Sequence, residues 1–441
     1  MTNPASSRRA STTAFHDPPP RRCPLCADTG VSWRDWAGLT SGPAGLIAER
    51  VLAGDVADYV RFRAACRGWR ACAADPRAHG VLDRRFHPRQ WVMLRETAAA
   101  PHRRRLLNLS TGECIATDLP ELGGHDVFGP TTEGLLVLLD RATYVVRLLN
   151  PITRQAADLP PATTLLSQSK VQRHDTRESL LISGAGLADD STFAVHFFMI
   201  RMLAVVKPGQ EHWTVVDNGN ILRPTMSFAG RFYAATTTDV MVVETSTGQP
   251  PRLAVAAKLA RAFSLMMMDT VHLVDNDGDL MLVDHERCHR TYTVYRVDLD
   301  ARKTVPVPGL GGRAAFIDVQ RALSVSPSVF PSIAADAVYL GFDDLFIGML
   351  DNSPYHLVDG ISETRDFGYF GFDDLFTGSA LDKYWYNDQI IDGTAEPPDH
   401  DDSSMAQYGP WGVADYLSSC VTGFRDDSEA FRGHLAISPP C

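Results

Sequence analysis

Residues 36–70 contain three short apolar segments: Trp36-Ala-Gly-Leu39, Leu46-Ile-Ala-Glu-Arg-Val-Leu52 and Asp55-Val-Ala-Asp-Tyr-Val-Arg-Phe-Arg-Ala-Ala-Cys-Arg-Gly-Trp-Arg70. In and just after the third, apolar side chains recur every three or four residues, at Tyr59, Phe62, Cys66, Trp69 and Ala73. This spacing places them on one face of an α-helix. The pattern therefore predicts an amphipathic helix that begins near residue 56 and continues to about residue 73.

The ends of this helix are marked by residues that suit helix termini. Asp55 and Asp58 lie at its start, where carboxylates accept hydrogen bonds from unpaired backbone N–H groups. Asp75 is followed by Pro76, and a residue before proline is disfavoured in the α conformation. A unit of about 40 residues buries too little apolar surface to be stable alone. It is expected to lean on the rest of the chain, on a partner, or on both.

Residues 33–80 resemble an F-box, the module by which a substrate receptor docks on the Skp-type adaptor of a cullin ubiquitin ligase. The most specific match is the run from Asp58 to Arg70, which ends in Cys-Arg-Gly-Trp-Arg. The resemblance implies that a set of apolar residues forms either the adaptor interface or the packing beneath it: Leu39, Leu46, Ile47, Val51, Leu52, Phe62 and Trp69. Deleting residues 33–80 should then abolish adaptor binding and leave the remaining domain soluble.

One departure from the F-box pattern concerns its first helix. The family usually carries Leu-Pro followed by helix-forming residues, whereas here Leu39 is followed by Thr-Ser-Gly-Pro-Ala-Gly. Two glycines and a proline weaken the first helical turn, which leaves adaptor binding open. The alternative is an N-terminal helical hairpin that only caps the larger domain.

From about Trp91 onward the pattern changes to short apolar runs separated by turn residues. Residues 135–139 and 143–149 predict one hairpin, and residues 271–274 and 279–283 predict another around Gly278. Many short strands with little room for helices predict an all-β domain at about 90–425, built as a sandwich stack or a propeller. A propeller suits the length better, with roughly seven or eight blades. The fold class is thus a small α-helical module followed by an all-β propeller-like domain.

The same region resembles the KIB-type β-propeller of plant, especially cereal, F-box proteins. The matching stretches occur in order after the F-box-like module, at 148–153, 158–161, 273–274, 278–283, 339–342 and 352–355. The resemblance implies a substrate receptor in the ubiquitin conjugation pathway, but it does not identify a substrate.

A short segment is duplicated near the end of this region. Gly341-Phe-Asp-Asp-Leu-Phe346 recurs as Gly371-Phe-Asp-Asp-Leu-Phe376. Only one copy is needed to complete a blade, and an apolar strand at 337–340 directly precedes the first. We therefore expect 361–390 to be a surface insertion whose removal costs little stability. Residues 1–32 are expected to be a disordered leader, and residues 426–441 a tail.

Composition excludes several classes of partner. The net charge of −11 and a pI near 5.7 argue against nucleic-acid binding. The apolar runs are far shorter than the about 20 residues of a membrane helix. Most of the eight cysteines are scattered, which favours a reducing compartment, the cytoplasm or nucleus. The first sixteen residues contain no acid, which leaves an organelle as the alternative.

Candidate metal ligands have simpler explanations. Cys23 and Cys26 lack a second pair of ligands. The polar run 284–289 lies between two predicted strands and reads as a hairpin loop. Asp275, Asp277, Asp279 and Glu286 have calcium-loop spacing, but the glycine stands at the wrong position.

No catalytic motif is present in the sequence. We expect a non-catalytic subunit without metal or cofactor. Its expected partners are a Skp-type adaptor, a cullin and an unknown protein substrate. The alternative is a ligase-independent propeller scaffold or inhibitor, which could be organelle-targeted.

Overall fold

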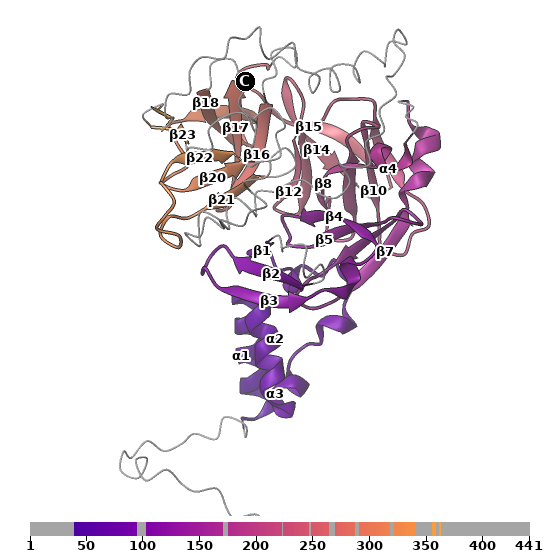
Figure 1. Cartoon of the computed structure of the whole chain (residues 1–441), viewed down its shortest axis with the longest axis vertical. Helices are drawn as coiled ribbons and strands as arrows, with labels where there is room; N and C mark the ends of the chain where they lie inside the picture. The colour runs from indigo at the N-terminus through magenta and orange to yellow at the C-terminus, as the bar shows by residue number, and fades with distance from the viewer. Residues whose placement is uncertain are drawn as a thin grey trace, which may run out of the picture.

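A computed structural model describes residues 39–94, 103–170, 175–222, 224–246, 248–263, 270–286, 291–317, 322–340, 355–358 and 361–362. Three helices come first: α1 (Ser41–Gly54), α2 (Val56–Ala65) and α3 (Arg67–Cys72). Two 3₁₀ turns follow, η3 (Pro76–Ala78) and η4 (Arg84–Phe86). Strands begin at Trp91, and Figure 1 shows the helices below the sheets, next to β1–β3. The predicted fold class is confirmed.

The prediction of a single helix over residues 56–73 is wrong in one respect, because this segment forms two helices. Cys66 has extended backbone angles of φ −154° and ψ 164°, and it separates α2 from α3. Its Sγ accepts a hydrogen bond from the backbone N–H of Trp69 at 3.3 Å. The sulfur therefore takes the capping role that serine or aspartate usually plays. Phe62 and Trp69 still stack across the break, with ring centroids 4.6 Å apart.

The strands form successive antiparallel sheets. The first contains β1 (Trp91–Met93), β2 (Arg103–Asn108) and β3 (Cys114–Asp118). The next two contain β4 (His125–Pro130), β5 (Leu136–Asp140), β6 (Val145–Leu149) and β7 (Ala156–Pro161), then β8 (Ile182–Leu187), β9 (Phe193–Phe197), β10 (Met202–Val206) and β11 (Thr214–Asn218). Between β7 and β8 lie η6 (Ala162–Gln168) and α4 (Thr176–Ser179), and η5 (Pro120–Leu122) precedes β4.

An eight-stranded sheet comes next and divides into two units. These are β12 (Thr225–Phe228), β13 (Arg231–Ala235), β14 (Asp239–Glu244) and β15 (Arg252–Lys258), then β16 (Thr270–Asn276), β17 (Asp279–Glu286), β18 (Thr291–Asp298) and β19 (Lys303–Val307). One parallel pair, Lys258 with Lys303, joins them. The last described sheet contains β20 (Ala314–Ile317), β21 (Ala322–Val325), β22 (Ala337–Leu340), β23 (Tyr355–His356) and β24 (Ile361–Ser362).

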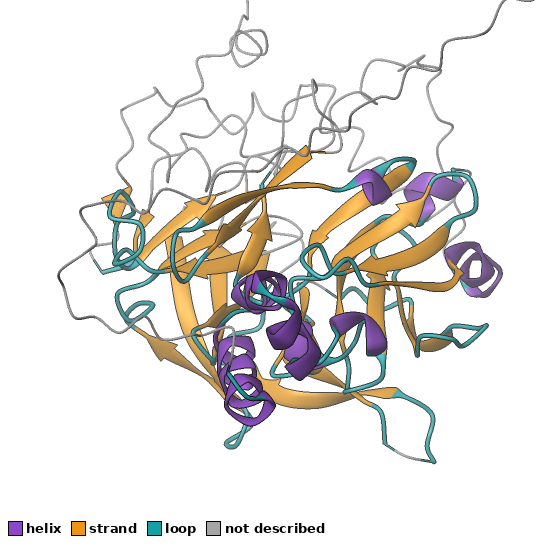
Figure 2. Ribbon diagram, turned by 90° about the horizontal axis from the view of Figure 1, so that it is seen from below, coloured by secondary structure: helices purple, strands orange, loops and turns teal. Residues whose placement is uncertain are grey.

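The sheets are arranged as propeller blades. Strand β8 packs beside β12, β16 beside β21, and β1 beside β4, so neighbouring sheets meet through strands at their edges. Figure 2, seen from below, shows several of the helices in front of the strands. Within the described ranges the sheets amount to six blades, fewer than the seven or eight expected.

The structural role expected for each copy of the duplicated segment stays a prediction, because 341–346 and 371–376 both lie outside the described residues. The strand expected before the first copy is confirmed as β22. Ile361 and Ser362 pair with β23, so the first two residues of the expected insertion take part in a sheet.

The core lies between the blades. All five residues of β9 are buried, and its four apolar residues divide between two apolar clusters. Phe193, Val195 and Phe197 pack with the β4–β7 sheet, whereas Ala194 packs with Phe232 of β13. Burial on both faces explains why four of the five residues of β9 are apolar. None of the helices in the described part of the chain is long and apolar enough to cross a membrane.

Candidate functional site

Two apolar side chains of α1 are exposed. Leu46 is 70 % exposed and Ile47 is 38 % exposed. Among the described residues only Leu181 and Val358 are other large apolar side chains with such exposure, and they lie apart on the propeller. Leu46 and Ile47 are neighbours on one helix, and we call this pair the α1 patch. Apolar side chains that are exposed next to one another are candidates for a surface that a partner covers.

The other residues predicted for the adaptor site lie underneath or beside this surface. Phe62 is buried in a cluster with Tyr59 and Phe86. Val51, Leu52 and Trp69 are half-buried and pack against the same cluster. Leu39 is half-buried directly before α1. The structure thus separates two roles that the sequence left together: Leu46 and Ile47 face outward, and the other helical residues hold the module together.

Asp55 joins the helical module to the propeller. Its Oδ1 caps α2 by accepting hydrogen bonds from the N–H groups of Ala57 at 2.6 Å and Asp58 at 3.1 Å. Its Oδ2 accepts from the indole Nε1 of Trp91 at 2.8 Å and from Nδ2 of Asn108 at 3.0 Å. Trp91 lies in β1 and Asn108 in β2, so one carboxylate ties a helix start to the first sheet.

Further contacts surround this carboxylate. Ala57 is buried with Trp91 and Leu106 in one apolar cluster. Arg61 of α2 forms an ion pair with Glu113, in the turn between β2 and β3. Removing residues 33–80 would strip these contacts and expose Trp91 and Leu106. We therefore expect the deletion to impair the propeller as well, contrary to the expectation from sequence.

The segment after the helices is hydrogen-bonded to the turn between β6 and β7. The side chain of Asn150 donates to the carbonyl of Phe86 at 2.7 Å, and His87 Nε2 donates to the carbonyl of Val81 at 3.1 Å.

Glu133, 4 % exposed, accepts hydrogen bonds from Leu187 N–H and from the hydroxyl of Ser227. Three successive sheets are thus linked by one buried carboxylate.

The buried imidazole predicts a pH dependence of stability. Desolvation lowers the pKa of His87, although the nearby carboxylate of Glu133 acts in the opposite direction. Below the usual histidine pKa of about 6.5, the unfolded chain takes up a proton that folded His87 resists. We expect the melting temperature to fall between pH 7 and pH 5.5, and to fall less in His87→Gln. Equal falls in both proteins would contradict this role.

The polar residues considered as metal ligands have structural partners. Asp284 of β17 pairs with Arg261 at 2.6 Å, and His285 stacks on Tyr292 with ring centroids 4.3 Å apart. Asp277 and Gly278 both have positive φ in the tight turn between β16 and β17, which confirms that hairpin. Cys23 and Cys26 lie outside the described residues. No group of three or more metal-ligating side chains occurs in the ranges that the structure describes.

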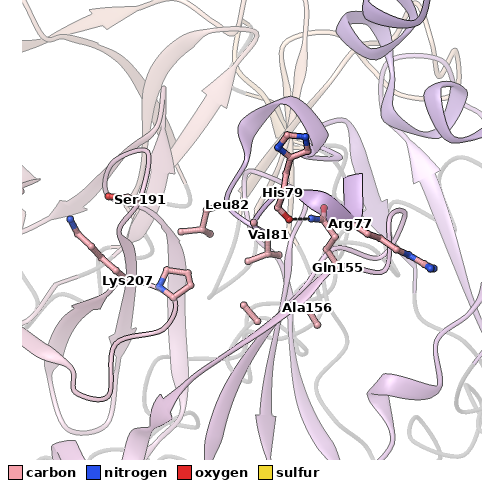
Figure 3. A pocket seen from close by; sticks show the side chains of 11 residues that line it. Arg77, His79, Val81, Leu82, Gln155, Ala156, Ser191 and Lys207 are labelled. Carbon is pink, nitrogen blue, oxygen red and sulfur yellow. Dashed lines mark hydrogen bonds between the residues drawn. The ribbon is translucent and has the colours of Figure 1, made fainter. Parts of the chain in front are cut away.

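A groove of about 600 Å³ lies beside the segment that leaves the helices. Its walls come from residues 77–82, the start of β7, the turn at Ser191 and the turn at Lys207 and Pro208. Figure 3 shows Arg77 on one side and Lys207 on the other, with Val81 and Leu82 between them. The groove has no signal in the sequence, because four distant segments form it and none of them carries a motif.

Several solved structures are distantly similar to this chain. YCF48 from Cyanidioschyzon merolae is 10% identical, with a TM-score of 0.33, and the match covers 56% of this chain and 94% of that one. A virginiamycin B lyase from Staphylococcus aureus is 7% identical, with a TM-score of 0.29, over 54% of this chain and 79% of that one.

No curated protein matches the sequence closely enough to count as a relative. The comparison with protein families gives a clear result. Residues 90–371, more than half of the chain, match the KIB1-4 beta-propeller. This range begins one residue before β1 and includes every described strand. The chain therefore belongs to the KIB1-4 beta-propeller family.

Proposed function

We propose that this protein is a non-catalytic substrate receptor of a Skp–cullin–F-box ubiquitin ligase. Its helical module binds the Skp-type adaptor through the α1 patch, and its propeller binds a protein substrate. The single observation that carries the proposal is the exposed Leu46–Ile47 pair on a module whose remaining apolar residues are packed. Catalysis belongs to partner enzymes, and the receptor contributes proximity.

The packing of the module supports this division of labour. Phe62 is buried, and Trp69 and Val51 are half-buried. These side chains stabilise the helices and expose little surface to a partner. Asp55 and Arg61 hold α2 against the first sheet. A partner bound to α1 would therefore be held at a defined position relative to the propeller, which a receptor that presents a substrate requires.

The α1 patch can be tested by charge substitution. We expect the double variant Leu46→Glu/Ile47→Glu to lose at least about 30-fold in affinity for a purified Skp-type adaptor. Burying one leucine is worth about 1.5–3 kcal/mol, and a buried unpaired carboxylate adds a further cost. Affinity is measured by biolayer interferometry with full-length protein, and the melting temperature is measured in parallel.

Leu181→Glu is the control, because Leu181 is an apolar residue on the propeller that is 38 % exposed, as Ile47 is. It should bind the adaptor like the unsubstituted protein. If the unsubstituted protein binds no Skp-type adaptor, the receptor hypothesis is wrong and a ligase-independent scaffold or inhibitor replaces it. If the double variant binds normally, the interface lies elsewhere on the module.

A further inference from the structure

The groove beside residues 77–82 combines an apolar floor with cationic rims. Val81 and Leu82 are buried beneath it, and Ala156 and Pro208 line it. Arg77 and Lys207, both exposed, stand on opposite sides (Figure 3). Within the described ranges neither of these two cations forms an ion pair, whereas Arg84 pairs with Asp190 at 2.7 Å. Two cations without an ion-pair partner among the described residues therefore flank the apolar floor of the groove.

We propose that this groove binds an extended acidic segment of a partner protein. Carboxylates of the segment pair with Arg77 and Lys207, and small apolar side chains between them cover the floor. The proposal concerns a surface distinct from the α1 patch, and it does not require adaptor binding.

The shape of the groove fits an extended chain. Ala156 and Ala157 belong to β7, the edge strand of its sheet, which pairs with β6 on one side. Small side chains on an edge strand leave room for another backbone to approach, which is how extended peptides are often recognised. One wall is also fixed, because the side chain of Gln155 donates a hydrogen bond to the carbonyl of His79. The groove is thus partly preformed.

Charge decides which kind of segment fits. The chain as a whole carries a net charge of −11, so its average field repels acidic partners. An acidic segment would bind only where cations are locally in excess, as at Arg77 and Lys207. Two cations are too few for a nucleic acid, which needs a longer basic track. No Asp or Glu is among the described residues that line the groove, and the nearby carboxylate of Asp75 already pairs with Arg63.

Defined peptides test the proposal on the full-length protein alone. The probes are fluorescein-labelled, end-capped peptides with two glutamates separated by two to five alanine or valine residues, and the same peptides with lysine in place of glutamate. We expect fluorescence anisotropy to show binding of at least one glutamate peptide and of no lysine peptide. Binding should weaken as NaCl rises from 50 to 300 mM, because exposed ion pairs are screened.

Two variants separate charge from shape. Arg77→Glu/Lys207→Glu should lower the affinity for the glutamate peptide at least about tenfold, the loss of about 1.4 kcal/mol. Ala156→Tyr, which fills the groove without changing its charge, should lower it as well. The matched control is Arg103→Glu/Lys303→Glu, which reverses two exposed cations in β2 and β19 and should bind normally.

Several outcomes would overturn the inference. Absence of binding by every glutamate peptide at 50 mM NaCl would do so, as would equal losses in the groove variant and in the charge-matched control. Preference for lysine peptides would also reject it. Leu46→Glu/Ile47→Glu should leave peptide binding intact, so failure of the groove and failure of the adaptor interface are distinguishable.

Discussion

Replacing Asp55 with alanine is expected to lower the free energy of unfolding by about 3–5 kcal/mol. The substitution removes the α2 cap, worth about 1 kcal/mol. It also leaves the indole N–H of Trp91 and the amide of Asn108 without their acceptor, although both residues are only 2 % exposed. An unsatisfied buried donor costs about 1–3 kcal/mol. Urea unfolding followed by tryptophan fluorescence measures the loss.

The neighbouring Asp58 supplies the control for this prediction. Its carboxylate is exposed and pairs with Arg61 at 2.8 Å on the helix surface. Asp58→Ala should therefore cost less than about 1 kcal/mol. Asp55→Asn is the more discriminating variant, because one amide oxygen can serve the cap or the propeller but not both. A loss close to that of Asp58→Ala in all Asp55 variants would refute the junction.

The junction also bears on the proposed function. Asp55 is the point at which the N-terminal module is attached to the first sheet by hydrogen bonds from two strands. Its loss should change the position of α1 relative to the propeller before it changes the α1 patch itself. An Asp55 variant that still binds the adaptor but no longer supports ubiquitination of a substrate would match the receptor model.

The sequence predicts those strands that are buried on both faces. Residues 202–206 are a continuous apolar run, and residues 194–200 are apolar except for His196; they become β10 and β9 with its following turn. Strand β3 was missed because its residues alternate between exposed and half-buried, so no apolar run exists. Outer strands of a blade face solvent, and their residues carry little hydrophobic signal.

Strand β8 was missed for a different reason. It contains Gly184 and Gly186, which weaken any strand pattern. The structure shows why they are needed: a Cβ at Gly184 would overlap the hydroxyl of Thr225 in β12, and one at Gly186 would lie 2.5 Å from Cβ of Ser227. Close packing between two blades therefore requires residues that hide the strand from sequence analysis.

The functional residues were only partly predictable. The apolar spacing identified the residues of the helical module, but exposure separates Leu46 and Ile47 from Phe62 and Trp69, and exposure depends on packing against Ile152 and Phe86 far along the chain. The extended break at Cys66 was missed because the helical spacing continues across it.

The other large effect is expected at Gly134, in the turn between β4 and β5. Its φ of +81° favours glycine, and a Cβ there would overlap the carbonyl oxygen of Pro88 and lie 2.6 Å from the carbonyl carbon. Both obstacles are backbone, so no side chain can move aside. Gly134→Ala must therefore displace the segment at Pro88 that leads from the helical module into β1. We expect a loss of at least about 4 kcal/mol.

Gly124→Ala separates the backbone strain of a positive φ from the steric overlap with Pro88, which Gly134→Ala combines. Its φ is +75°, but a Cβ there would meet no atom within 4 Å. Gly124→Ala should cost only the strain of a left-handed alanine, about 1–2 kcal/mol. The difference between the two variants in urea unfolding measures the close approach of Pro88 to the β4–β5 turn. If both variants lose the same amount, Pro88 yields easily and the linker is not fixed at the centre of the propeller. A clear difference would mean that the chain between the α1 patch and the first blade is held in place by contact with the propeller core.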